Sequence, residues 1–113
     1  MMGIKRYLNR LVERPPLLYR MLFPETVWRL HFKPRTVYLT FDDGPIPEVT
    51  PWVLDTLDHY GVKATFFCVG ENVQRNPELF QELLRRGHSV GNHTMNHMQG
   101  AKVSTKVYLH NVF

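Results

Sequence analysis

The sequence lacks the features that define several classes of protein. It has one cysteine, Cys68, among 113 residues, which excludes an internal disulfide and a zinc module built from several cysteines. It has no apolar run near the roughly 18 residues that a membrane-spanning helix needs. The basic start of the chain is not followed by the apolar stretch of about 7–15 residues that is typical of a signal peptide. We therefore expect a cytoplasmic or membrane-surface location.

Basic charge is scarce outside the N-terminal third of the chain. Residues 1–36 carry eight Lys or Arg and two Glu, whereas residues 37–113 carry six bases and eight acids. The net charge of +4 therefore belongs to an N-terminal extension, and the remainder is mildly acidic. The bases form no recognised nucleic-acid-binding module and the acidic remainder would repel phosphate, so we expect no nucleic-acid partner.

The N-terminal extension begins with an amphipathic pattern. Five apolar residues recur at helical spacing before a proline pair ends the pattern: Ile4, Tyr7, Leu8, Leu11 and Val12. We expect residues 1–35 to form a basic amphipathic helical extension. Its apolar face can pack on the rest of the fold. Alternatively, residues 1–14 can contact an anionic membrane surface.

Strand and helix signals alternate from residue 36 onward, in a chain whose 43% hydrophobic and 21% charged content is typical of one folded domain. Apolar and β-branched segments predict strands at residues 36–41, 64–70 and 88–92. Helices are predicted at 51–60 and 77–86, each with a proline at its first position and a glycine after its end. Thr50 and Asn76 are the expected N-caps. This order predicts an α/β fold of parallel strands joined by right-handed crossovers.

Acidic and histidine side chains follow the first and third predicted strands. Asp42 and Asp43 come after the first strand, and His93 and His97 come after the third. Because the carboxyl ends of parallel strands lie on one rim of a sheet, we expect these side chains to meet. Two histidines four residues apart can point the same way on a helical turn and, with one carboxylate, form a three-ligand site typical of catalytic zinc or a related ion. Such an ion acidifies bound water and polarises a carbonyl oxygen, which favours hydrolysis of an amide or ester.

Simpler interpretations of both groups stay open on the residues alone. Adjacent aspartates before Gly-Pro are common in plain turns, and a histidine pair at this spacing is often coincidental. The residues also leave open which aspartate binds the ion and which takes a proton from the attacking water.

These same residues resemble two motifs of a known family. Thr40–Pro45 (Thr-Phe-Asp-Asp-Gly-Pro) and His93–His97 (His-Thr-Met-Asn-His) are similar to the first two motifs of the polysaccharide deacetylases, the NodB-homology carbohydrate esterases. The resemblance covers residues 36 to about 100, and residues 1–35 lie outside it.

The resemblance implies a fold, an activity and a role for each site residue. The family removes N- or O-acetyl groups from carbohydrate polymers such as chitin-like chains, peptidoglycan or xylan, with a divalent metal on a distorted β/α barrel. By motif position, Asp42 would be the general base, and Asp43, His93 and His97 would be the metal ligands. Zinc is the expected ion, although two histidines and one aspartate also suit cobalt or nickel.

The chain also departs from the family, because the family's three later motifs are missing. We therefore expect residues 36–113 to form the N-terminal part of such a domain, a partial β/α barrel with about three parallel β/α units. An open sheet edge could pair with another copy, so self-association is also expected. The alternative hypothesis is a truncated non-catalytic chain that binds metal or glycan, or that needs a missing C-terminal half for activity.

Four other side chains are expected to have structural rather than chemical roles. Cys68 lies within a predicted strand, where a buried thiol behaves as a small hydrophobic group. Trp52 is expected in the core, and His88 is expected to cap an element or lie at the surface. His110 is expected on the helix that follows the histidine motif.

Overall fold

The computed structural model of the chain describes residues 15–28 and 35–113. The chain divides between residues 36 and 37 into two compact units, each of which is described by itself. Among the described residues, none of the helices has the length and apolar character needed to cross a membrane. The helix expected from the pattern at residues 4–12, and the membrane contact expected through residues 1–14, lie outside the described residues.

Among the described residues of the first unit, a short helix, α2 (Leu17–Leu22), directly follows the proline pair. The ring of Tyr19 contacts Phe23 and Trp28, with ring centroids 5.2 and 5.9 Å apart. The Trp28 indole N–H also donates a hydrogen bond of 3.1 Å to the Phe23 carbonyl. These contacts fold the chain after α2 back on the helix.

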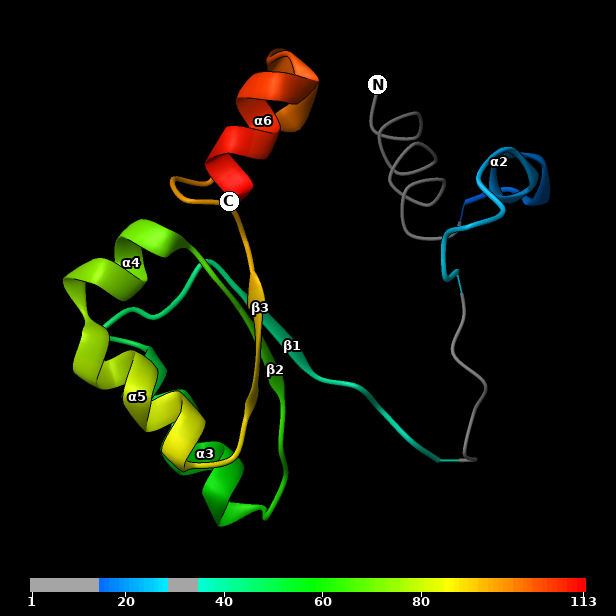
Figure 1. The fold of residues 1–113 in the computed structure, drawn as a ribbon. Coiled ribbons are helices and arrows are strands. Elements are labelled where there is room, and N and C mark those ends of the chain that lie inside the picture. The colour runs from blue at the N-terminus through cyan, green and yellow to red at the C-terminus, as the bar shows by residue number, and fades with distance from the viewer. Residues whose placement is uncertain (1–14, 29–34) are drawn as a thin grey trace, which may run out of the picture. The chain divides into compact units, whose positions relative to one another are not determined.

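The second unit is built on three parallel strands in the order β1-β2-β3 (Figure 1). The strands are β1 (Thr40–Asp42), β2 (Thr65–Cys68) and β3 (Ser89–Asn92). In the register of the sheet, Phe66 pairs with Phe41 on one side and with Val90 on the other. The predicted α/β fold with parallel strands is confirmed.

Helices connect and follow these strands. They are α3 (Thr50–His59), α4 (Gly70–Arg75), α5 (Pro77–Arg85), the 3-10 helix η1 (Gly100–Lys102) and α6 (Thr105–Val112). Figure 1 shows α3, α4 and α5 along one side of the sheet. The sequence did not predict α4, because six residues are too few to show a helical period and the preceding strand was expected to continue to residue 70.

The core lies between the sheet and the helices α3 and α5. Leu54 of α3 and Leu83 of α5 are fully buried, and Phe66 of β2 is buried beside them. Phe41 of β1 stacks on Phe66, with ring centroids 5.0 Å apart. Burial of these side chains is the main favourable contribution to the stability of the unit.

Glycine ends both long helices as predicted. Gly61 and Gly87 have φ angles of 63° and 75°, a conformation that only glycine adopts without strain. The N–H of Gly61 donates to the Asp58 carbonyl, and that of Val62 donates to the Leu57 carbonyl. This paired arrangement satisfies the last carbonyls of α3.

Of the two predicted N-caps, Asn76 is confirmed in position and Thr50 is wrong, and neither side chain accepts a hydrogen bond from its helix. Thr50 is the first residue of α3 rather than its cap, and its hydroxyl accepts a hydrogen bond from the Ile46 N–H at 2.8 Å. Asn76 does occupy the N-cap position of α5, but its side chain donates to the Asn72 carbonyl at 3.1 Å instead of accepting from α5. Both side chains satisfy the preceding loop or helix, which sequence position alone does not reveal.

The first strand is shorter and more exposed than predicted. It begins at Thr40 rather than residue 36, and both Thr40 and Asp42 are exposed. Thr40 pairs with Thr65, the first residue of β2, so the residues before Thr40 lie beyond the start of β2 and, in the described part of the chain, have no strand to pair with there. Pairing with β2 alone also makes β1 an edge strand among the described residues.

Trp52 is not in the core. Its side chain is 68% exposed, because α3 buries the helical face that carries Thr50, Val53, Leu54 and Leu57. The indole instead lines an apolar groove of about 600 Å³ with neighbours that include Phe41 and Tyr60.

His88 is buried rather than placed at the surface. It is only 5% exposed, its Nδ1 accepts a hydrogen bond of 3.3 Å from the Ala64 N–H, and its Nε2 has no partner among the described residues. Burial, followed by the positive charge of Lys63, lowers the pKa of His88 from its ordinary value. The folded chain therefore holds this imidazole in its neutral form near pH 7.

We expect this histidine to make stability depend on pH. As the pH falls, His88 takes up a proton in the unfolded chain before it does so in the folded chain. The stability that neutral His88 contributes is therefore complete above about pH 6.5, the ordinary pKa of histidine. It is lost as the pH falls through the lower pKa of the folded state. Urea unfolding of the metal-free chain at about pH 7.5 and about pH 5.5 measures this loss. His88→Gln, which cannot be protonated, should show a smaller loss than the natural chain. An equal loss in both would assign the dependence to other groups.

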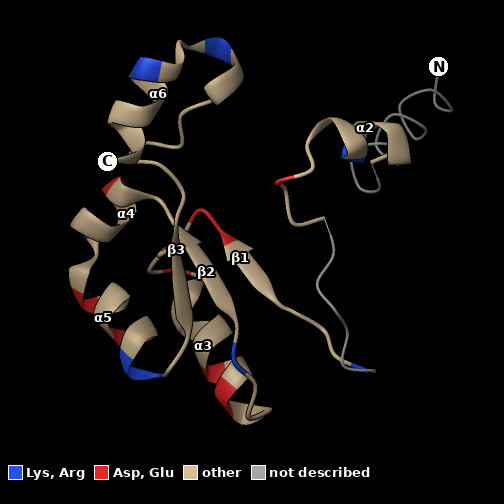
Figure 2. Cartoon of the chain, turned by 45° about the vertical axis from the view of Figure 1, so that its right-hand side comes forward, with Lys and Arg blue, Asp and Glu red and all other residues tan. Residues whose placement is uncertain are grey.

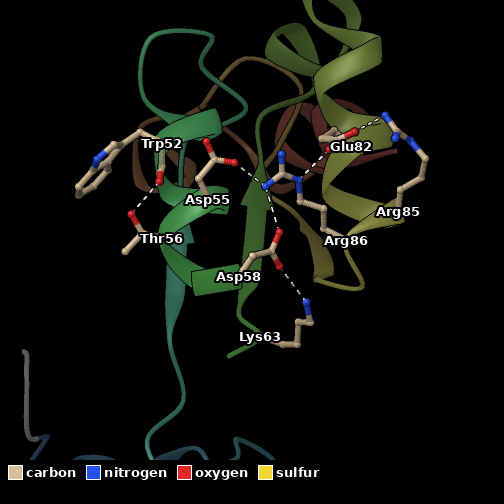
Figure 3. A network of polar contacts seen from close by, with 8 residues as sticks. All are labelled: Trp52, Asp55, Thr56, Asp58, Lys63, Glu82, Arg85 and Arg86. Atoms are coloured by element: carbon tan, nitrogen blue, oxygen red, sulfur yellow. Dashed lines mark hydrogen bonds and ion pairs between the residues drawn. The ribbon is translucent and has the colours of Figure 1, made fainter. Parts of the chain in front are cut away.

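A network of charged side chains connects α3 and α5 near the start of β3 (Figure 3). The Arg86 guanidinium contacts three carboxylates, those of Asp55, Asp58 and Glu82, at 2.7 to 3.0 Å. Lys63 also pairs with Asp58 at 3.2 Å. The hydrogen bond from Lys63 is the largest cause that lowers the pKa of Asp58. The network fixes the two helices relative to each other at the end of the sheet opposite the acidic loop after β1.

Candidate metal centre

Two loops meet at the carboxyl end of the sheet. One follows β1 and contains Asp43, and the other follows β3 and contains His93 and His97. Both are anchored to β2, because the Asp43 N–H donates to the Phe67 carbonyl at 3.1 Å and the His93 N–H donates to the Cys68 carbonyl at 3.0 Å. Figure 2 shows the acidic segment at this end of β1.

Three of the four predicted site residues converge on one point. The Nε2 atoms of His93 and His97 each lie 3.2 Å from Oδ1 of Asp43. One ligand atom from each of the three side chains lies within 4.8 Å of the others, as a shared metal ion requires. His93 is half-buried, whereas Asp43 and His97 are exposed, so one side of the cluster faces solvent.

The convergence depends on an unusual backbone rather than on a helical turn. Asp43, Thr94 and His97 have φ angles of 72°, 64° and 56°, in the left-handed region that non-glycine residues rarely adopt. The expected helical turn is therefore wrong, because residues 94–96 form a tight turn between the two histidines. Strained residues of this kind persist only where the surroundings hold them, and they gather at functional sites.

The histidine loop is held from within and from α6. The Asn92 side chain accepts from the Thr94 N–H at 2.8 Å, and the Thr94 hydroxyl accepts from the Met98 N–H at 3.0 Å. From α6, the side-chain oxygen of Asn111 accepts from the Met95 N–H at 3.0 Å. No local sequence pattern predicts this contact of Asn111, because the contact depends on how α6 folds back over the loop.

Gly70 lets α4 approach the histidine loop closely. A Cβ atom on Gly70 would lie 2.5 Å from Sδ and 3.1 Å from Cα of Met95. The only local signal for this contact is a glycine at the end of the strand predicted at residues 64–70, which is typical of close backbone approach.

The fourth predicted residue, Asp42, is the last residue of β1 and is exposed beside the cluster. Among the described residues, its carboxylate is not one of the clustered ligand atoms. At the end of β1, the Asp43 carboxylate therefore joins the cluster, and the adjacent Asp42 carboxylate stays outside it.

The side chains of Cys68 and His110 lie outside the cluster. Cys68 is buried, and burial raises the pKa of its thiol, so it is held in the unreactive protonated form. His110 lies on α6, as predicted, and lines a cavity of about 570 Å³ between β3 and α6.

The family is decided by comparison with known proteins. Residues 30–112 match the model of the polysaccharide deacetylases. The chain belongs to the polysaccharide deacetylase family. The match confirms the resemblance found in the motifs and extends it at both ends. Members of this family are hydrolases, and the predicted partial β/α barrel is the fold that the chain shares with their solved structures.

Individual polysaccharide deacetylases give the extent of the similarity. The chain is 48% identical over 77 residues to a peptidoglycan-N-acetylglucosamine deacetylase of Bacillus cereus, covering 68% of this chain and 36% of that protein. It is 56% identical over 63 residues to a chitooligosaccharide deacetylase of Bradyrhizobium, covering 56% of this chain and 29% of that protein.

A solved relative shows the same fold. The acetyl xylan esterase of Clostridium thermocellum, solved in complex with a cobalt ion, superposes with a TM-score of 0.62 at 38% identity, covering 66% of this chain and 37% of that one. The chain thus spans about a third of the length of these relatives.

Proposed function

We propose that this protein is a metal-dependent hydrolase that removes N-acetyl or O-acetyl groups from a carbohydrate polymer. The observation that carries the proposal is the convergence of Asp43, His93 and His97 at the carboxyl end of the sheet, in a chain of the polysaccharide deacetylase family. The names of the relatives favour peptidoglycan or chitin-like oligosaccharides as the substrate class.

The three side chains suit a divalent metal ion. Two imidazole nitrogens and one carboxylate oxygen form the donor set of many catalytic zinc sites, which keep at least one open position. Both His Nε2 atoms lie 3.2 Å from the same oxygen of Asp43, and the exposed side of the cluster leaves space for water and substrate. We propose zinc as the ion, with cobalt and nickel as alternatives, and the cobalt ion of the solved relative fits this set.

The proposed chemistry is attack of water on an acetyl carbonyl. A bound divalent ion would supply Lewis-acid chemistry, polarising the carbonyl and acidifying the attacking water. Asp42 would accept the proton of that water as general base, and Asp43 would remain ionised as a ligand. Hydrolysis of an N-acetyl group would release acetate and leave the free amine on the sugar.

Two matched substitutions test these roles. We expect Asp42→Asn to keep the Zn²⁺ affinity of the natural chain and to lower acetate release from an N-acetylglucosamine oligomer by about 10² to 10⁴-fold. Asp43→Asn should instead lower the Zn²⁺ affinity. The measurements are calorimetric titration with Zn²⁺ and an acetate assay on the same preparations. Loss of metal binding in Asp42→Asn would show that the two roles are assigned wrongly.

The same assay separates the two hypotheses drawn from the sequence. Acetate release by the natural chain at enzymatic rates supports the hydrolase. One bound Zn²⁺ without acetate release supports the alternative, a non-catalytic chain or one that needs a further segment. Membrane contact through residues 1–14 and self-association through the sheet edge stay predictions from the sequence.

A further inference from the structure

Helix α4 forms hydrogen bonds with both loops of the candidate metal centre. The Asn72 side chain donates from Nδ2 to the Asp43 carbonyl at 2.6 Å. At the start of the same helix, the Gly70 N–H donates to the Thr94 carbonyl at 3.0 Å and the Glu71 N–H donates to the Met95 carbonyl at 2.8 Å. A single turn of helix therefore bridges the loop after β1 and the loop after β3.

The bridge acts on the strained part of the backbone. Asp43 and Thr94, whose carbonyls accept from α4, are two of the residues with positive φ. Such a conformation costs about 1–3 kcal/mol, so each residue needs contacts that hold it. The Asp43 N–H is held by β2, and the Asp43 carbonyl is held by Asn72, so both bonds fix the backbone from which the carboxylate reaches the two histidines.

The side chain of Asn72 is the part of this bridge that a substitution can remove. The other two bonds come from backbone N–H groups, which every residue except proline supplies. Asn72 is half-buried and bonds to the backbone of Asp43, not to its carboxylate, so it leaves the ligand atoms free. It therefore acts on the site through the placement of Asp43.

We propose that Asn72 is a positioning residue of the metal centre, which holds Asp43 at the distance from His93 and His97 that one metal ion requires. The proposal rests on the proposed metal-dependent function. Removing a group that orients a ligand typically costs about 10–100-fold in metal affinity. We expect a loss of this size in Asn72→Ala.

The test is a calorimetric titration of the full chain with Zn²⁺ and, in parallel, with Co²⁺ followed by its visible absorption. Asn72→Ala should bind both ions about 10–100-fold more weakly, with a changed Co²⁺ spectrum that reports altered ligand geometry. Gln74→Ala is the matched control, because Gln74 is an exposed amide on the same helix whose side chain makes no hydrogen bond within the described residues. Equal affinity and an equal spectrum in Asn72→Ala and Gln74→Ala would overturn the proposal.

A double-mutant cycle separates positioning from general loss of structure. If Asn72 acts through Asp43, Asn72→Ala should cause no further loss of affinity in a chain that already carries Asp43→Ala. A second full loss in that background would show that Asn72 supports the fold and not the ligand, and would overturn the proposal.

Hydrogen exchange of the metal-free chain gives a readout that is independent of metal. Asn72→Ala should speed exchange at the Asp43 amide and leave the Phe66 amide in β2 unchanged. Unchanged exchange at Asp43 would overturn the positioning role. If the natural chain binds neither ion, the proposed function fails and the assignment to a metal centre fails with it. Tight binding by both the natural chain and Asn72→Ala would overturn the inference alone.

Discussion

Replacing His93 with alanine is expected to lower the Zn²⁺ affinity of the chain by at least about 100-fold. Loss of an orienting neighbour alone typically costs about 10–100-fold, and His93 is proposed to supply a ligand atom itself. Without His93, the cluster keeps two ligand atoms, the Asp43 oxygen and the His97 nitrogen 3.2 Å from it. Two protein ligands are too few for a tight zinc site. Calorimetric titration of the purified full chain with Zn²⁺ measures the change.

His59→Ala provides the matched control for this experiment. His59 is an exposed histidine at the end of α3, beside Tyr60, and it is not one of the clustered ligands. Its removal should leave one equivalent of tightly bound Zn²⁺. Equal affinity in His93→Ala and the natural chain would contradict the ligand set, and loss of affinity in His59→Ala would point to binding elsewhere on the surface.

Replacing Leu83 with alanine is expected to reduce the free energy of unfolding by about 2–5 kcal/mol. Leu83 has no solvent-exposed area and contacts the core between α5 and the sheet, so its truncation removes apolar contacts and leaves a cavity. A domain of this size has a total stability of only about 5–15 kcal/mol, so the loss is a large share of it. Urea unfolding followed by circular dichroism measures the difference.

The neighbouring leucine gives a control with the same chemistry. Leu84 is the next residue of α5 but is 40% exposed, so Leu84→Ala should cost less than about 1 kcal/mol. Equal losses in the two variants would mean that α5 does not pack against the sheet through Leu83 in solution.

The His93 and Leu83 substitutions test different parts of the molecule, the candidate metal centre and the hydrophobic core. The core around Leu54 and Leu83 holds α3 and α5 on the sheet, and the sheet brings the loops after β1 and β3 to one end. Variants of the ligands should therefore change metal binding with little change in stability, whereas Leu83→Ala should weaken both. That contrast distinguishes a loss of the site from a loss of the fold that supports it.

The positions of the main elements could be predicted from local sequence patterns. Gly61 and Gly87 end α3 and α5 because the left-handed conformation after a helix strongly favours glycine, wherever the helix lies in the fold. The parallel order also followed from the sequence, since helical segments between strands allow parallel pairing. These features depend on neighbours close in the chain.

The residues of the candidate site could be named from the sequence, but the way they meet could not. Asp43, His93 and His97 follow predicted strands, and the rule that strand ends share a rim placed them together. Their convergence depends on left-handed backbone at Asp43, Thr94 and His97, and local pattern predicts none of these angles. Several of the contacts that hold them, such as those of Asn72 with Asp43 and of Gly70 with Thr94, come from residues distant in the chain.

By itself, the sequence thus determined the family, the alternation of strands and helices, and the identity of the candidate ligands. The tertiary structure alone decided that Trp52 is exposed, that His88 is buried, and that Asn72 reaches the Asp43 carbonyl. The physical reason is distance along the chain. Turn and cap chemistry act between near neighbours. The contact of His88 with Ala64 and that of Asn72 with Asp43 join residues 24 and 29 positions apart, and they arise only after those segments have packed together.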